Sequence, residues 1–111
     1  MSVKELKSRW KASAENDRAS ERIFSIFKHG GVLCVDQTPF GRAENDLIDF
    51  RGYDANQILV RDVVLKDIDL SYSNFSNSWM EASRFENCLF EKTDFSGASD
   101  HGNIFEHCVF V

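Results

Sequence analysis

Cysteine side chains are among the few residues of this chain that could act as metal ligands, nucleophiles or disulfide partners. There are three of them, Cys34, Cys88 and Cys108. They form no CxxC pair, and no histidine stands at the spacing that zinc sites use. An odd number of thiols in this arrangement is typical of reduced cysteines. We therefore expect reduced thiols and no metal or other cofactor.

A second group with chemical potential lies near the C-terminus, where Asp100 and His101 are adjacent and His107 follows. These residues are candidates for a metal site or a catalytic pair. Three residues without further ligands are poor evidence for either, and a polar cap or local bulge also explains Asp100. The sequence contains no nucleophile–base pair and no glycine-rich phosphate loop, so we expect no enzymatic activity.

Acidic residues are concentrated in the second part of the chain. Residues 1–47 hold 8 Lys/Arg against 7 Asp/Glu, whereas residues 48–111 hold 5 against 11, a net charge of −6. Such a segment is unsuited to binding nucleic acid through its phosphates, but it suits a basic protein partner. A solvated face without a partner is the alternative. The candidate protein-binding residues are Trp79, Glu81, Arg84, Glu86, Glu91 and Glu106.

The elements that must position these residues begin with a helical segment over residues 1–31. Ser2 and Glu5 form a capping box at its start. A new cap at Ser13 or Asn16 predicts a break, followed by a second helix that glycines end. The first 31 residues are therefore expected to form two helices.

Apolar residues at the end of the second helix, Ile23, Phe24 and Phe27, must face another part of the chain. The helical segment is therefore expected to dock on the remainder. Residues 32–47 read as an entry strand over 32–35 and a turn. Neither a secretory leader nor a stretch of about 20 apolar residues is present, so we expect a cytoplasmic protein without membrane contact.

From residue 48 to the end, the chain divides into units of five residues without an insertion. A period of five fits neither a helix nor a strand. The third residue of each unit is apolar in twelve of thirteen units, the first is small or aliphatic in most, and the fourth and fifth are mostly polar. Two inward and three outward positions in each repeat are typical of a solenoid.

The units IDLSY, SNFSN and TDFSG resemble the pentapeptide-repeat family, whose unit is written A-(D/N)-L-x-x. The resemblance covers residues 48–111, and the register can be run back through Phe40 and Val35. It implies an all-β solenoid, a right-handed quadrilateral β-helix of about three coils with rungs about 4.8 Å apart. The N-terminal α-helical segment precedes this solenoid. The resemblance also implies binding of macromolecules rather than catalysis.

Residues twenty apart are expected to stack in one column of such a coil. Cys88 and Cys108 then lie one rung apart in an inward column, where parallel side chains disfavour a disulfide. The second position of each unit is expected to be exposed. Apolar ladders then form at Leu59 with Trp79 and at Leu89 with Val109, and we expect the second helix to cover one of them.

The last unit, CVFV, stops in mid-register, which predicts unpaired rungs. A homodimer through the C-terminal coil would pair them; the alternative is that something the sequence does not show protects this edge. The possible oligomer edge consists of Leu89, Val109, Phe110 and Val111.

Two binding functions fit the size and the charge. In the first, the chain is a small cognate inhibitor or immunity protein whose rigid acidic face binds a basic partner such as a bacterial toxin. In the second, it mimics DNA and acts on a type II topoisomerase, as the resemblance to quinolone-resistance members suggests. The first requires no long rod and is the one that we expect. A structural or regulatory module is a third possibility, because a fold does not define a function.

Overall fold

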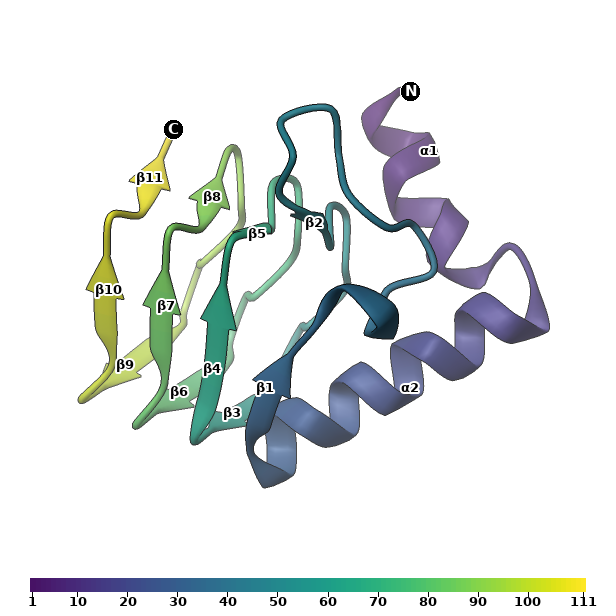
Figure 1. Ribbon diagram of the computed structural model, residues 1–111. Coiled ribbons are helices and arrows are strands. Elements are labelled where there is room, and N and C mark those ends of the chain that lie inside the picture. Colours follow the sequence, from purple (N-terminus) through teal and green to yellow (C-terminus); the bar gives the residue numbers. More distant parts are fainter.

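A β-solenoid of about three turns follows an N-terminal helical segment in the computed structural model, which describes residues 1–111 (Figure 1). All pairings between its named strands are parallel. The prediction of an all-β solenoid preceded by helices is confirmed. The radius of gyration is 12.6 Å, and the longest dimension is 35 Å.

The helical segment consists of α1 (Val3–Ser8), the 3₁₀ turn η1 (Arg9–Lys11) and α2 (Ala14–His29). The capping box is present, since the Glu5 backbone N–H donates to Ser2 Oγ and the Ser2 N–H donates to the Glu5 carboxylate. Ser13 caps α2, which confirms the predicted break. Gly30, with φ of 92°, ends α2 in a conformation that favours glycine.

The solenoid has four sides, and three of them are parallel sheets. The first side contains β2 (Ile48–Asp49), β5 (Ile68–Asp69), β8 (Leu89–Phe90) and β11 (Val109–Phe110). The third contains β3 (Leu59–Arg61), β6 (Trp79–Glu81) and β9 (Ser99–His101). The fourth contains β1 (Gly31–Leu33), β4 (Val63–Lys66), β7 (Arg84–Glu86) and β10 (Ile104–Glu106). The second side is held by single bridges from Asp54 to Asn74 and on to Asp94.

Each corner is made by the fifth residue of a unit. From Gly52 to His107, every fifth residue has a positive φ, between 51° and 78°. This left-handed conformation is least costly for glycine, asparagine and aspartate, which occupy seven of the twelve positions. The five-residue period therefore reflects four left-handed corners in each turn of the coil.

Asp or Asn at the second position completes many of these corners. On the first and second sides, its side-chain oxygen accepts the backbone N–H two residues later, in an Asx turn. The acceptors are Asp49, Asp54, Asp69, Asn74 and Asp94. Part of the acidic character of the solenoid therefore has a structural role.

The core consists of the inward columns that the repeat predicts. Phe85 stacks on Phe105 with ring centroids 4.7 Å apart, and Phe90 stacks on Phe110 at 4.8 Å. All three cysteines are free thiols, and Cys88 donates a hydrogen bond to a backbone carbonyl one turn below. Burial raises the pKa of the Cys88 thiol to about 12, which makes it unreactive near neutral pH.

The backward extension of the register is wrong. The extended register places Val35 at a third position, twenty residues before Ala55, but Val35 does not lie in a strand. Leu33 lies beside Leu65 in the fourth-side column, and the entry strand is β1 at Gly31–Leu33 instead of 32–35. Val35 begins the 3₁₀ turn η2 (Val35–Gln37). The regular repeat does not extend before residue 48, because the segment between β1 and β2 forms a long loop instead of five-residue units.

The loop after η2 also takes Phe40 out of the repeat. Its ring packs edge-on against Trp10 of the helical segment, with centroids 4.8 Å apart. Thr38 Oγ1 donates to the Asp49 carbonyl at 2.7 Å and anchors the loop on the first side. The loop therefore covers that side instead of forming a regular turn.

The second helix covers the N-terminal end of the solenoid, not an apolar ladder on its side (Figure 1). Ile23 and Phe27 are completely buried, and the Phe27 ring packs against Tyr53 and Phe75. Both residues belong to the same hydrophobic core as the inward residues of the solenoid, so α2 shields the open end of that core from water. Phe24 points away and is 47% exposed.

Candidate functional site

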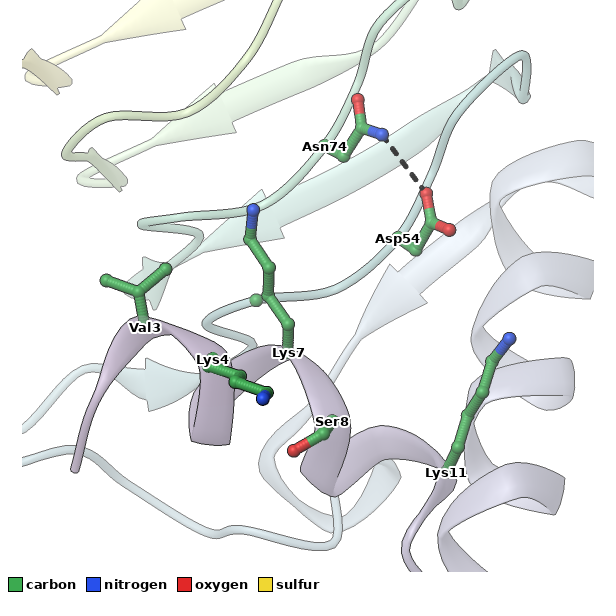
Figure 2. A pocket seen from close by; sticks show the side chains of 8 residues that line it. Val3, Lys4, Lys7, Ser8, Lys11, Asp54 and Asn74 are labelled. Carbon is green, nitrogen blue, oxygen red and sulfur yellow. Dashed lines mark hydrogen bonds between the residues drawn. The ribbon is translucent and has the colours of Figure 1, made fainter.

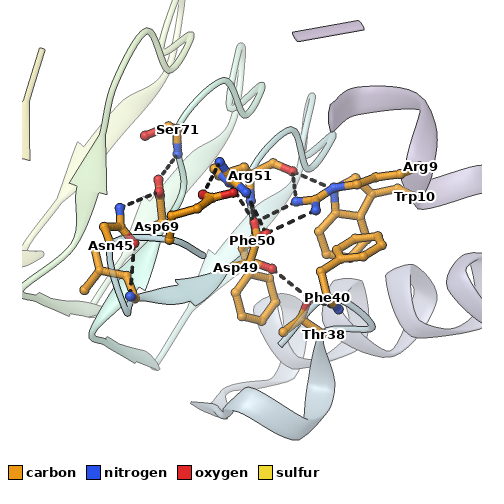
Figure 3. A network of polar contacts seen from close by, with 12 residues as sticks. Arg9, Trp10, Thr38, Phe40, Asn45, Asp49, Phe50, Arg51, Asp69 and Ser71 are labelled. Carbon is orange, nitrogen blue, oxygen red and sulfur yellow. Dashed lines mark hydrogen bonds and ion pairs between the residues drawn. The ribbon is translucent and has the colours of Figure 1, made fainter. Parts of the chain in front are cut away.

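A buried ionic network joins the helical segment to the first side of the solenoid (Figure 3). The Arg9 guanidinium donates to both Asp49 carboxylate oxygens, at 2.6 and 3.1 Å, and Arg51 donates to both at 3.0 Å. The Arg9 guanidinium also lies over the Phe40 ring, 3.7 Å from its centroid. Each carboxylate oxygen of Asp49 therefore accepts hydrogen bonds from both arginines, an arrangement suited to a structural anchor.

Asp49 is only 3% exposed, although it occupies a second position that was expected to be exposed. Burial raises the pKa of this carboxyl, but hydrogen bonds from Arg51 and Arg9 outweigh that effect and hold the pKa below its ordinary value. Asp69, one turn further, is equally buried and accepts a hydrogen bond from Asn45 at 3.0 Å. The expected exposure is wrong at these two positions, because Arg9 and Arg51 cover Asp49 and the loop residue Asn45 covers Asp69.

The predicted protein-binding residues lie on three sides of the coil and form no single cluster. Trp79 and Glu81 lie on β6 of the third side. Glu91 follows β8 on the first side. The remaining residues, Arg84, Glu86 and Glu106, lie on β7 and β10 of the fourth side.

Two of the four predicted glutamates have arginine partners. Glu81 accepts from Arg61 at 2.7 Å, and Glu106 accepts from Arg84 at 2.7 Å. Both pairs are solvent-exposed, so each contributes at most about 1 kcal/mol to stability. Their charges nevertheless cancel locally. The fourth side is therefore less acidic than its glutamates suggest.

Trp79 is the most prominent side chain of the third side. It is 47% exposed, and its ring stacks on the His101 imidazole with centroids 3.7 Å apart. Leu59 lies beside it in the sheet register, as predicted. The expected covering of an apolar ladder by the second helix is wrong, because Trp79 here and Val109 on the first side, 52% exposed, are both open to solvent.

Asp100 ends the third-side column beside Met80 and is exposed. Its carboxylate accepts from the Asn103 amide, which also donates to the Met80 carbonyl. It therefore fits a polar cap at the last turn. No group of three or more His, Cys, Asp or Glu side chains is arranged to hold a metal ion.

The predicted oligomer edge lies at the last turn of the described chain. Val109, Phe110 and Val111 are exposed, whereas Leu89 is partly covered. Sequence reasoning missed that the apolar surface continues around this end to Ile104 and Phe105 of β10. The available signal was the apolar pair Ile104–Phe105 in the unit NIFEH. The homodimer stays a prediction.

Sequence reasoning also missed a cavity of about 620 Å³ between α1 and the second side (Figure 2). Lys4, Lys7 and Lys11 line it, together with Asp54 and Asn74. The lysine spacing of three and four residues, which places side chains on one helical face, was the available signal.

None of the helices is both long and apolar enough to span a membrane. The chain is 34% identical over 87 residues to the uncharacterized protein YjcF of Escherichia coli (strain K12). The aligned region covers 78% of this chain, and this chain covers 18% of the relative. No protein-family profile matches the chain, and no solved structure matches it.

Proposed function

We propose that this chain is a non-catalytic protein-binding module of the pentapeptide-repeat type. In this proposal it acts as a small cognate inhibitor or immunity protein that binds a basic partner, such as a bacterial toxin. The observation that carries the proposal is Trp79, a half-exposed tryptophan on a hydrogen-bonded strand within a segment of net charge −6. Tryptophan is enriched among the residues that dominate protein–protein binding energies.

The rigidity of the site supports this proposal. β6 is paired on both edges, to β3 and β9, so that Trp79 loses little conformational freedom on binding. Its stack on His101 restricts the ring further. Less entropy is then lost when a partner binds, which raises affinity for a given contact area.

The charge of the solenoid supports a basic partner. Glu86 and Glu91 have no cation within ion-pair distance. Glu86 lies on β7 of the fourth side, and Glu91 directly follows β8 of the first side. Unpaired carboxylates speed association with a cationic surface and repel phosphates. The proposal therefore includes no direct binding of nucleic acid and no membrane contact. It includes a cytoplasmic location, where the exposed Cys34 stays reduced.

The test is capture of the partner from the source cells with tagged wild-type protein, followed by an activity assay of the captured protein. We expect one basic protein whose toxic activity the chain abolishes. Trp79→Ala should weaken the complex by at least about 2 kcal/mol, as at an interface hot spot. Glu86→Lys should slow association and flatten its dependence on salt.

The matched control is Glu15→Lys, the same charge reversal at an exposed position of α2. It should leave capture unchanged. If Trp79→Ala and Glu15→Lys bind the partner as the wild type does, the proposed surface is wrong. If no captured protein is basic or inhibited, the inhibitor function is wrong.

A DNA mimic that acts on a type II topoisomerase is the second candidate. It is favoured by the register that places Glu106 beside Glu86 in successive rungs, because phosphates also repeat along DNA, although Arg84 pairs with Glu106 and reduces the negative charge there. A gyrase supercoiling assay tests it, with inhibition or protection from quinolones as the expected result. No effect at micromolar protein excludes this candidate and leaves the inhibitor proposal intact.

A further inference from the structure

Three lysines of the helical segment face a common cavity in a protein that is otherwise acidic. Lys4 and Lys7 lie on successive turns of α1, and Lys11 ends the following 3₁₀ turn. The cavity of about 620 Å³ lies between them and the second side of the solenoid. Its volume is in the range of small-molecule sites. The Lys7 side chain extends across the opening toward Asp54 and Asn74 (Figure 2).

None of these lysines forms an ion pair with a carboxylate. The nearest charge effect is on Asp94, whose pKa is lowered by hydrogen bonds from Ser96 and, to a smaller extent, by the charge of Lys7. All five ion pairs of the molecule use arginine. Asp54 is the one acidic residue that lines the cavity, and its Oδ1 accepts from the Asn56 backbone N–H and the Asn74 amide. The cavity thus carries two net positive charges within a chain of net charge −5. Like charges on one helical face repel each other, and an anion bound between them removes that repulsion.

Close contacts with Arg51 and Gly52 fix the position of the helical segment that bears the lysines. A Cβ at Gly52 would lie 2.6 Å from the Leu6 carbonyl oxygen, so only glycine permits this approach of α1. Trp10 Nε1 donates to the Arg51 carbonyl at 2.9 Å on the same segment. The lysine backbones are therefore preorganised relative to the second side, which lowers the cost of binding.

A second cavity of about 280 Å³ shares Lys7, Lys11 and Asp54 with the first. It adds aromatic lining, of which the Phe24 ring is exposed. The combined groove is lined by Lys4 in the first cavity, by Phe24 in the second, and by Lys7, Lys11 and Asp54 in both. Asp54 Oδ2 accepts no hydrogen bond from the protein and is available to a ligand.

We propose that this groove binds a nucleoside polyphosphate. The three lysines contact the phosphates, Asp54 accepts hydrogen bonds from the sugar hydroxyls, and the base packs on Phe24. Each part of the ligand meets a protein group of matching chemistry. The lysine ammonium groups suit the phosphates, the Asp54 carboxylate suits the two sugar hydroxyls, and the Phe24 ring suits the planar base. The groove does not include Trp79, so this site stands independently of the proposed partner surface.

The test is isothermal titration of the full chain with ATP, tripolyphosphate and adenosine at about 0.1 M salt, where distant charges are largely screened. We expect saturable binding of ATP with a Kd below about 1 mM. Tripolyphosphate should bind at least about fivefold more weakly, because it lacks the base. Amide NMR shifts caused by ATP should map to the lysines of α1 and to Asp54.

Lys7→Gln is expected to weaken ATP binding about tenfold, the effect of one charge-assisted contact. Phe24→Ala should weaken binding of ATP but not of tripolyphosphate. The matched control is Lys66→Gln, an exposed lysine on β4 of the fourth side, which should change neither. These side chains are exposed, and NMR spectra without ligand verify that each variant folds.

Several results would overturn the assignment. Absence of saturable ATP binding below about 1 mM excludes the site. Equal losses in Lys7→Gln and Lys66→Gln show that only overall charge attracts the ligand. If tripolyphosphate binds as tightly as ATP and Phe24→Ala has no effect, the groove does not recognise a nucleoside.

Discussion

Replacing Asp49 by asparagine is expected to weaken the attachment of the helical segment to the solenoid. Asparagine keeps the side-chain oxygen that accepts the Arg51 backbone N–H, at 3.1 Å in the native structure, so the turn survives. The substitution removes the charge that pairs with Arg9 and Arg51. The substitution therefore measures the contribution of the ion pairs to stability without that of the local turn.

The magnitude follows from burial. The side chains of Arg9, Arg51 and Asp49 are 12%, 17% and 4% exposed, and Arg9 Nε already has no hydrogen-bond partner. Removing one member of a buried ion pair costs about 3–5 kcal/mol. Both arginines retain some solvent contact and a second acceptor, so we expect about 3 kcal/mol. A domain of this size has a total stability of about 5–15 kcal/mol.

The assay is urea unfolding followed by circular dichroism. With a urea dependence of about 1.5 kcal/mol/M, the midpoint should fall by about 2 M. Asp69→Asn is the matched control, since Asp69 has the same position one turn further, the same burial and no ion pair. It should cost less than about 1 kcal/mol.

A double-mutant cycle with Arg9→Met completes the experiment. The cost of Arg9→Met should be smaller in Asp49→Asn than in the wild type, by the coupling energy of the pair. Equal costs for the two asparagine variants, or a coupling energy near zero, would refute the anchoring role of Asp49.

Four further outcomes are expected. Phe85→Ala should lower the free energy of unfolding by about 3–5 kcal/mol in the same assay, and a loss below 1 kcal/mol would contradict its core position. Exposed Cys34 should react with a thiol reagent at once, whereas Cys88, with its pKa raised by burial to about 12, should react only on unfolding. The pKa of Asp49 is lower in the folded than in the unfolded state, so its contribution to stability is complete above the unfolded pKa of about 3.9 and is lost as pH falls through the folded pKa. The unfolding free energies of the wild type and Asp49→Asn, measured at decreasing pH, should therefore converge at low pH. If the C-terminal coil dimerises, Phe110→Asp should convert a dimer to a monomer in sedimentation velocity, and an unchanged sedimentation coefficient would exclude this edge.

The five-residue period predicts most of the solenoid because every contact that it implies is periodic. Apolar third positions predict the columns, such as Leu65 with Phe85 and Phe105, and residues that tolerate a positive φ predict the corners. The helix caps at Ser2 and Ser13 are equally local, because each depends on a side chain and a backbone N–H three residues away. These features require no knowledge of distant parts of the chain.

The helical segment and the loop of residues 34–47 have no repeat, and nothing local defines where they lie. The burial of Asp49 and Asp69 results from contacts with Arg9 and Asn45, which are 40 and 24 residues away along the chain. A repeat pattern treats Asp69 and Asp94 alike, although one is covered and the other exposed.

Some features of the candidate sites could be predicted from the repeat, and others depend on tertiary contacts. Exposure of Trp79 follows from the repeat, since second positions point outward on the third side. The dispersal of the glutamates over three sides follows from the repeat as well, once the corners are counted. The lysine groove does not, because it exists only where α1 approaches the second side at Gly52. Contacts between segments distant in sequence created that groove, and no periodic signal records them.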